Sequence, residues 1–324
     1  MLARCLSASL QGLDARAVTV EVDLAPGLPG VQMVGLPDKA IQESRERVRS
    51  ALCNSGFRGP LVRVVVNLAP ADLKKEGPTF DLPIALALLA ASGQLDRPIL
   101  DGLWCAGELG LDSILLPIRG TIAIAACEAE QNASAPLIPE GNAAEAALIP
   151  SLSVPLARDL SSLVEQLQHR KSWRPFTASS ALQDAKSPYP LPTLDDASPL
   201  QGKGARAHAI TAAGAYQILL VGPPGCGKTR MARQLPDLLP PLTEREALTV
   251  TRIRSIAGLI HDPTALHSQR PFRAPHHSCS RASLLAVDVQ PKPGELSLAH
   301  NGVLFLDEVA QGTYKPSDHL QLLK

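Results

Sequence analysis

The chain has 324 residues, 45% of them hydrophobic and 19% charged, and its 31 basic side chains balance its 31 acidic ones. This composition excludes a wholly disordered chain, and the zero formal net charge excludes attraction of nucleic acid by overall charge. At about 150 residues per domain, the length predicts two domains. Six scattered cysteines without a C-x-x-C pair indicate free thiols, and no apolar run approaches the roughly 18 residues of a membrane span. We therefore expect a soluble, cytoplasmic protein without a signal peptide or a membrane partner.

Residues 1–169 mix strand and helix patterns, as expected of one α/β or α+β domain. Alternating apolar residues and β-branched runs predict strands at 18–24, 31–34, 61–68, 103–109 and 136–138. Helical spacing or continuous apolar sequence predicts helices at 38–53, 81–92, 120–130, 143–148 and 159–168. In the first of these helices, Ile41, Ser44, Val48 and Leu52 share one face, and Gly56 lies just beyond the end.

Residues 170–193 differ in composition from both flanking regions. They are rich in proline and serine and show no periodicity, which predicts a semi-stiff interdomain linker. Residues 194–324 then form the predicted second domain.

The second domain contains a predicted phosphate loop, the Walker A motif. Residues 217–233 read QILLVGPPGCGKTRMAR, in which G-x-x-x-x-G-K-[ST] follows a short apolar run that predicts a strand and precedes a predicted helix. Glycines let backbone N–H groups turn toward a phosphate, and the helix N-terminus adds a positive dipole end. Lys228 would neutralise the β- and γ-phosphates, and the Thr229 hydroxyl would bind Mg²⁺. We predict that ATP is bound by Gly222, Pro223, Pro224, Gly225, Cys226, Gly227, Lys228 and Thr229.

A second motif follows about 80 residues later. After a helix predicted from Thr243, with Glu246 completing a capping box, residues 302–306 read GVLFL and predict an apolar strand. Asp307 and Glu308 follow directly, as in a Walker B motif. Asp307 would bind Mg²⁺ through water, and Glu308 would be the catalytic residue that polarises the attacking water.

Several long strings closely resemble the ComM/YifB family of magnesium-chelatase-like AAA+ ATPases. These strings are LPDKAIQESRERVRSALCNSGF, VNLAPADLKKEGPTFDLPIALALLAASGQL, VGPPGCGKT, RPFRAPHHS and PGELSLAHNGVLFLDE. The resemblance implies a Lon-protease-like α+β domain, with a ribosomal S5 domain 2-like fold, followed by a P-loop AAA+ α/β domain. It also implies homo-oligomeric rings and, in full-length relatives, DNA as a partner in branch migration during natural transformation.

The Lon-like resemblance raises the question of protease activity. Lon-type proteases use a serine in a Gly-Pro-Ser segment and a lysine in a later helix, whereas this chain has Thr79 after Gly77-Pro78 and Ile124 near the lysine position. A hydroxyl nucleophile without a base is not activated. We therefore expect that the chain is not a protease.

Two weaker groups of candidate residues remain. His276, His277 and Cys279, with His261 and His267 upstream, lack the spacing of a zinc site, which favours hydrogen bonding or a ring interface. Lys74 and Lys75 form either a solvated turn or a phosphate contact.

Three features depart from the family pattern. LAVDV at 285–289 replaces a glycine-rich run, VAQGTYK at 309–315 replaces a Pro-Glu-Phe-type stretch, and only 16 residues follow Glu308. The sensor-1 strand, arginine finger and helical lid of an AAA+ module do not fit in those residues. We therefore expect a partial AAA+ domain in a truncated chain with impaired hydrolysis, because an arginine finger contributes roughly 10³–10⁵ in rate.

Three interpretations are considered at this point. The chain is either such an ATP-binding protein or a non-catalytic remnant that acts as a partner-binding or oligomerisation module. A magnesium-chelatase ATPase subunit in tetrapyrrole synthesis is the third interpretation, and the fused Lon-like domain argues against it.

Overall fold

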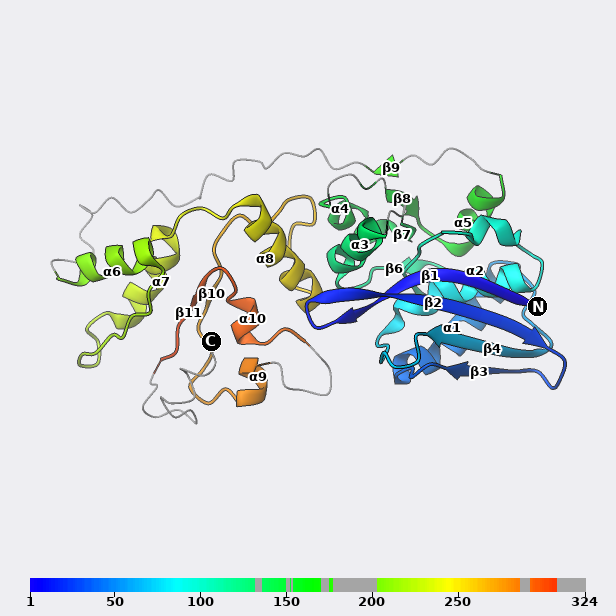
Figure 1. Cartoon of the computed structure of the whole chain (residues 1–324), viewed down its shortest axis with the longest axis horizontal. Coiled ribbons are helices and arrows are strands. Elements are labelled where there is room, and N and C mark those ends of the chain that lie inside the picture. The colour runs from blue at the N-terminus through cyan, green and yellow to red at the C-terminus, as the bar shows by residue number, and fades with distance from the viewer. Residues whose placement is uncertain are drawn as a thin grey trace. The chain divides into compact units, whose positions relative to one another are not determined.

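The computed structural model describes residues 1–131, 136–149, 152, 154–169, 175–176, 203–285 and 292–307. The chain divides into two compact units, residues 1–180 with 258–264 and residues 181–257 with 265–324 (Figure 1). Helices and strands occur in both units, so the predicted mixed α/β class is confirmed. The boundaries predicted at residues 169 and 194 stay predictions, because most of residues 170–202 lie outside the described part.

The first unit contains both strands and helices. Its strands are β1 (Leu2–Gln11), β2 (Asp14–Ala25), β3 (Gly30–Val34), β4 (Arg63–Ala69), β5 (Glu108–Leu109), β6 (Leu115–Leu116), β7 (Ile138–Pro139), β8 (Val154–Ala157) and β9 (Pro175–Phe176). Its α-helices are α1 (Lys39–Asn54), α2 (Asp81–Ala91), α3 (Thr121–Glu130), α4 (Ala143–Ala146) and α5 (Leu160–Gln168). Short 3₁₀ turns are η1 (Pro78–Phe80), η2 (Arg97–Leu100) and η3 (Glu140–Asn142). The predicted strand at 103–109 is wrong over most of its length, because only β5 and isolated bridges at Trp104 and Cys105 form there.

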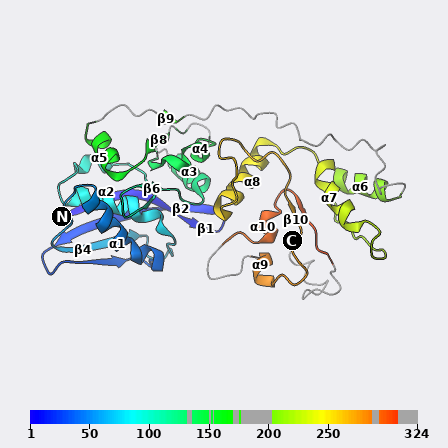
Figure 2. The ribbon, with the colours of Figure 1, turned by 180° about the vertical axis from the view of Figure 1, so that it is seen from behind.

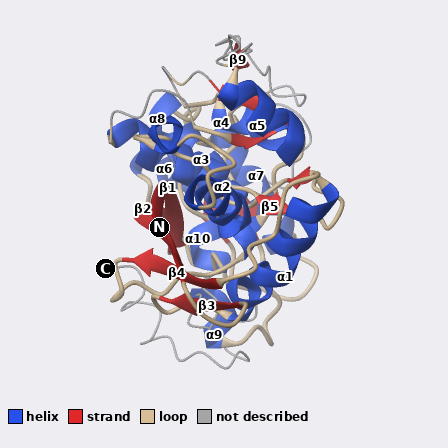
Figure 3. Ribbon diagram, turned by 90° about the vertical axis from the view of Figure 1, so that its right-hand side faces the viewer, coloured by secondary structure: helices blue, strands red, loops and turns tan. Residues whose placement is uncertain are grey.

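A four-stranded sheet in the order β1-β2-β4-β3 organises this unit. β1 pairs antiparallel with β2, β2 antiparallel with β4, and β3 parallel with β4. Alternate residues of the central strands are buried, so one face of the sheet forms the core. Helices α1 and α2 lie on the same side of the four strands (Figure 3), and their apolar side chains complete that core.

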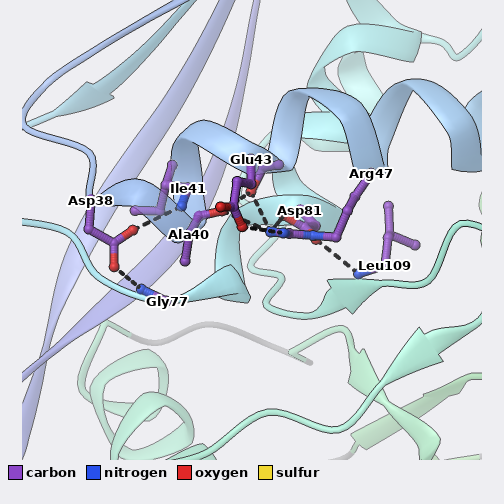
Figure 4. A network of polar contacts seen from close by, with 9 residues as sticks. Asp38, Ala40, Ile41, Glu43, Arg47, Gly77, Asp81 and Leu109 are labelled. Atoms are coloured by element: carbon purple, nitrogen blue, oxygen red, sulfur yellow. Dashed lines mark hydrogen bonds and ion pairs between the residues drawn. The ribbon is translucent and has the colours of Figure 1, made fainter.

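Helix α1 confirms the pattern predicted for its sequence. All four residues of the predicted face are buried, together with Ala51. Asp38 caps the N-terminus of the helix, because its Oδ1 accepts from the Ile41 N–H at 2.8 Å (Figure 4). Its Oδ2 accepts from the Gly77 N–H, outside the helix, at 3.0 Å. Gly56 has a φ of +80° just past the helix end, a conformation that glycine adopts without steric cost.

Strand β1 is missing from the sequence-based prediction. The residues that it buries are Ala3, Cys5, Ser7, Ala8 and Ser9. These side chains are small or polar, so they give little of the apolar alternation by which a strand is recognised. The hairpin with β2, in register Cys5↔Val20, supplies the pairing that the pattern did not reveal.

Helix α2 is buried along its whole length, including Asp81 at its first turn. Arg47 from α1 meets this carboxylate with two hydrogen bonds, Nε to Oδ2 at 2.6 Å and Nη2 to Oδ1 at 3.0 Å (Figure 4). The Leu109 N–H donates to Oδ2 at 3.2 Å, and Arg47 also donates to the Ala40 carbonyl. The bond to Asp81 raises the pKa of Arg47, and the hydrogen bonds of Asp81 join α1, α2 and β5.

The first prediction concerns this pair. Arg47→Ala leaves the fully buried Asp81 carboxylate without its countercharge, so we expect the first unit to lose about 3–5 kcal/mol of unfolding free energy. Urea unfolding measures the loss. Arg45→Ala is the matched control, because Arg45 is exposed and pairs with Glu46 on the same helix, and a surface pair contributes at most about 1 kcal/mol. Equal losses in both variants would contradict the argument.

A second buried carboxylate, Glu128 in α3, lies in apolar surroundings. Its side-chain oxygens have no hydrogen-bond partner among the described residues, and burial raises the pKa of Glu128 to about 8. The carboxyl is therefore protonated in the folded chain at neutral pH, whereas in the unfolded chain it ionises near a pKa of about 4.3.

The second prediction follows from that difference. The folded state holds the extra proton, so the contribution of Glu128 to stability is full below the unfolded pKa and is lost as the pH rises through about 8. We expect unfolding free energy to fall across this window by up to about 1.4 kcal/mol per pH unit. Glu128→Gln should remove that slope, whereas Glu130→Gln, at an exposed position of the same helix, should keep it. Parallel slopes in denaturant titrations from pH 5.5 to 8.5 would refute the assignment.

The second unit contains α6 (Lys203–Gly214), α7 (Lys228–Leu238), α8 (Glu244–Ala257), β10 (Phe272–Arg273), α9 (Arg281–Leu285), α10 (Glu295–Leu298) and β11 (Val303–Leu304). Helices α6 and α7 lie side by side in both views (Figures 1 and 2). The predicted capping box of α8 is confirmed, since the Thr243 N–H donates to Glu246 Oε2 at 2.8 Å and the Glu246 N–H to Thr243 Oγ1 at 3.3 Å. Helix α6 was not predicted. No helix within the described ranges is long and apolar enough to cross a membrane.

Candidate functional site

The predicted phosphate loop runs directly into helix α7. Gly227 is the N-cap of that helix with φ +86° and ψ +13°, and Gly225 has φ +77°. Both residues are in the left-handed region that side chains with a β-carbon rarely adopt. At Gly222 a β-carbon would lie 2.9 Å from Cys226 Sγ, so that side chain would have to move. The glycine spacing of the motif thus matches the backbone geometry of the loop.

Lys228, the first residue of α7, points its ammonium back into the loop. Its Nζ donates to the carbonyl oxygens of Gly222 at 2.9 Å and Pro223 at 3.0 Å. The side chain therefore places one positive charge at the loop, where the helix N-terminus adds its own partial positive charge. An anion bound at the loop would meet both charges.

Thr229 and Asp307 lie next to each other although 78 residues separate them in sequence. Thr229 Oγ1 is 3.4 Å from Asp307 Oδ2. A hydroxyl and a carboxylate are oxygen ligands of the kind that Mg²⁺ prefers. The structure therefore brings the two predicted metal ligands together beside the loop, whereas the predicted catalytic Glu308 lies outside the described residues.

Asp307 reaches this position because of the pairing between β10 and β11. The Val303 N–H donates to the Pro271 carbonyl and the Phe305 N–H to the Arg273 carbonyl, each at 2.8 Å. Gly302 permits the approach, because a β-carbon there would lie 2.0 Å from the Pro271 oxygen. Two short parallel strands thus fix the segment that ends at Asp307.

An ion pair supports the same segment and was not anticipated from the sequence. Arg273 donates from Nε and Nη2 to the two carboxylate oxygens of Glu295, both at 2.6 Å, which raises the pKa of Arg273. The rings of Phe272 and Phe305 stack with centroids 6.3 Å apart. The only sequence signal was that RPFR and PGEL belong to the strings of the family resemblance.

The strand predicted before the phosphate loop does not form, so this prediction is wrong. Residues 217–221 have no strand conformation, and Leu219 and Val221 are 82% and 86% exposed. A strand with apolar residues on both faces needs neighbouring strands and a covering layer on each side. No described residue pairs with this segment in a sheet, so its apolar sequence alone does not make it a strand.

The weaker candidates give a mixed outcome. His276 and His277 are exposed with ring centroids 4.0 Å apart, and the part of the chain that is described has no group of three potential metal ligands. For Lys75, both the solvated turn and the phosphate contact are wrong. Its side chain is fully buried, and its Nζ donates to the carbonyls of Gly35 and Pro70. Lys74 is exposed and pairs with Glu76 at 2.6 Å.

Comparison with known proteins gives matches in both halves of the chain. A family model described as magnesium chelatase, subunit ChlI, matches residues 198–321, and one described as subunit ChlI of Mg-chelatase matches residues 20–142. The chain is 42% identical over 313 residues to the uncharacterized protein YifB of Salmonella typhimurium, covering 96% of this chain and 60% of YifB. It is 42% identical over 323 residues to the competence protein ComM of Haemophilus influenzae, covering 99% of this chain and 62% of ComM. It is also 40% identical over 313 residues to protein Rv2897c of Mycobacterium tuberculosis, covering 96% of this chain and 61% of that protein.

The matches and the loop geometry define a magnesium-chelatase-related protein with two ChlI-like segments. Within this class, the chain belongs to the ComM/YifB family. It spans about 60% of the length of these curated relatives.

The third prediction tests how Asp307 is positioned. Gly302→Ala places a β-carbon against the Pro271 carbonyl, so the backbone must move and the β10–β11 hydrogen bonds lengthen. We expect a loss of about 1–3 kcal/mol in the second unit and faster amide exchange at Val303 and Phe305. Gly30→Ala is the control, because no heavy atom lies within 4 Å of a β-carbon there. Unchanged exchange at both amides would show that the close approach is not needed.

Proposed function

We propose that this chain binds ATP with Mg²⁺ at residues 222–229 and Asp307. The observation that carries the proposal is the 3.4 Å approach of Thr229 Oγ1 to Asp307 Oδ2 at the end of the predicted phosphate loop. The residues present fit the ligand: the loop glycines leave its backbone accessible, one ammonium faces the loop, and two oxygen ligands lie beside it.

Each residue has one role in this proposal. The Lys228 ammonium exchanges its two carbonyl partners for phosphate oxygens, and the backbone N–H groups of the loop donate to the same phosphates. Thr229 and Asp307 hold the metal, and Glu308 orients and polarises water for hydrolysis. Bound ATP supplies a phosphoanhydride bond whose hydrolysis can drive work.

For the whole protein we propose the role that the family resemblance implies. The 42% identity to the competence protein ComM supports a place in DNA processing during natural transformation, with DNA as the partner and a homo-oligomeric ring as the working form. Residues 20–142, matched by a ChlI model, would supply the Lon-protease-like domain, and residues 198–321 the AAA+ module. Hydrolysis by this chain alone is proposed to be weak, since a strand before the loop is not formed.

A second candidate function is a partner-binding module without catalysis. The observation in its favour is the exposure of Leu219 and Val221 immediately before the loop. The two proposals differ in whether Lys228 contributes to any nucleotide affinity.

The fourth prediction separates these two proposals. ATP titrations followed by calorimetry should show Mg²⁺-dependent binding to the unmodified chain and at least tenfold weaker binding to Lys228→Ala, because a hydrogen bond to a charged group contributes roughly 1.5–3 kcal/mol. Asp307→Asn should lose only the Mg²⁺-dependent part of the ATP affinity. Its affinity should therefore equal that of the unmodified chain in excess EDTA. Lys292→Ala, at an exposed position of the same unit, should bind as the unmodified chain does. Equal, negligible binding by the unmodified chain and Lys228→Ala would refute the ATP site and leave the binding module.

A further inference from the structure

Two buried cysteines meet in the first unit, although 100 residues separate them in sequence. Cys5 Sγ lies 3.2 Å from Cys105 Sγ, and the two residues are 1% and 0% exposed. The sulfur atoms of a disulfide are about 2.05 Å apart, so the two thiols need to approach each other by about 1 Å. A shift of this size is comparable with the ordinary thermal displacement of protein atoms, about 0.9 Å.

Backbone pairing between β1 and residues 103–105 brings the two thiols together. Leu6 forms a parallel bridge with Trp104. The Leu6 N–H donates to the Leu103 carbonyl at 3.1 Å, and the Cys105 N–H donates to the Leu6 carbonyl at 2.9 Å. Because successive side chains of an extended segment point to opposite faces, Cys5 and Cys105 both lie on the face opposite to Leu6. The fold itself therefore places the two thiols beside each other.

The surroundings of the two thiols contain polar groups. Ser7 follows Leu6 in β1 and lies on the same face as Cys5, and its buried Oγ has no hydrogen-bond partner among the described residues. A buried hydroxyl without a partner is uncommon in native proteins, and this one is placed to donate to a sulfur anion. Burial, followed by the contact with Cys5 and the charge of Glu128, raises the pKa of Cys105. Cys105 is therefore a protonated thiol in the folded chain at neutral pH.

We propose that Cys5 and Cys105 are a redox modification site, which a peroxide converts to a disulfide that stabilises the first unit and which a dithiol reductant restores. One thiol loses its proton and attacks an oxygen of hydrogen peroxide. A sulfur–oxygen bond forms, the oxygen–oxygen bond breaks, and the departing hydroxide takes up a proton to become water. The other sulfur then attacks this sulfenic acid, so that a sulfur–sulfur bond forms and a second water leaves. Two thiols and one hydrogen peroxide thus become one disulfide and two water molecules.

The burial of the two thiols determines how the reaction proceeds. An oxidant reaches them when residues 103–105 separate from β1, which breaks the two backbone hydrogen bonds to Leu6. Cys53 and Cys226 are exposed and need no such opening, so we expect them to react with peroxide first. Once formed, the disulfide closes a loop of about 100 residues and restricts the unfolded chain, which stabilises the folded first unit.

A packing contact is the alternative interpretation. A thiol in a protein core behaves as a small hydrophobic group with a weak S–H donor, and such a pair needs no chemistry to explain it. The two interpretations differ in one observable, the covalent bond between residues 5 and 105 in the oxidised folded chain.

The test treats the folded, reduced chain with hydrogen peroxide, blocks the remaining thiols with iodoacetamide and maps the peptides by mass spectrometry without reductant. We expect a peptide in which Cys5 and Cys105 are cross-linked, with two hydrogen atoms fewer than its separate parts, and we expect dithiothreitol to cleave it. The midpoint of thermal unfolding should be at least about 5 °C higher in the oxidised chain than in the reduced one. Cys5→Ala and Cys105→Ala should each abolish both the cross-link and this shift. Cys127→Ala is the matched control, since Cys127 is also a buried free thiol of the first unit, and it should keep both.

Four results would overturn the proposal. The first is the absence of the Cys5–Cys105 peptide, which leaves a packing contact. The second is the same share of this peptide among all cross-links when the chain is oxidised in urea, which would show that the fold does not direct the pairing. The third is equal cross-linking of Cys105 to Cys127, and the fourth is a cross-link without the thermal shift. Both thiols lie in the first unit, so Lys228→Ala affects none of these readouts, and this proposal and the ATP site fail or stand separately.

Discussion

The first unit depends on one buried carboxylate. Asp81 is fully buried at the start of a helix whose residues are all buried. A buried carboxylate group is stable only when hydrogen-bond donors surround it. Arg47 supplies two of them and Leu109 the third. Since these donors come from α1 and β5, the position of the most apolar helix is tied to both of these elements. The apolar sequence of α2 provides the driving force for packing, and this ion pair fixes the orientation.

The candidate site of the second unit depends on contacts that are distant in sequence. The conformation of the loop and of the start of α7 is determined locally, by the left-handed glycines and the helix N-terminus. The neighbourhood of Thr229 and Asp307 is not local: it requires β11 to pair with β10 and Gly302 to pass close to Pro271. The phosphate-loop motif thus predicts the position of Thr229 locally, whereas tertiary structure brings Asp307 beside it.

The sequence-based prediction was accurate where local signals determine the structure, and it was wrong where pairing with distant residues determines it. Helix α1 has apolar spacing, an N-cap at Asp38 and a terminal glycine, and its burial matches the pattern residue for residue. Strand β1 escaped detection because it buries serine and alanine, and the pairing with β2 that stabilises it is not visible in its own sequence. Lys75 was expected in a turn, yet two backbone carbonyls accept from its ammonium inside the fold. For residues 218–221 the prediction was wrong for the opposite reason. Their own sequence has a strong strand pattern, but they form no strand because no described neighbour pairs with them.

The two prolines that follow the exposed apolar segment have a consequence for how the chain behaves in solution. A short, flat run of aliphatic residues with unpaired backbone is the kind of sequence that seeds cross-β aggregation. Pro223 and Pro224 follow Val221 after a single glycine, Gly222, and neither can donate a hydrogen bond to an incoming strand. A growing ladder of identical chains would therefore stop at the phosphate loop after four or five residues. The two prolines inside the predicted phosphate loop would thus oppose self-assembly of the segment before it.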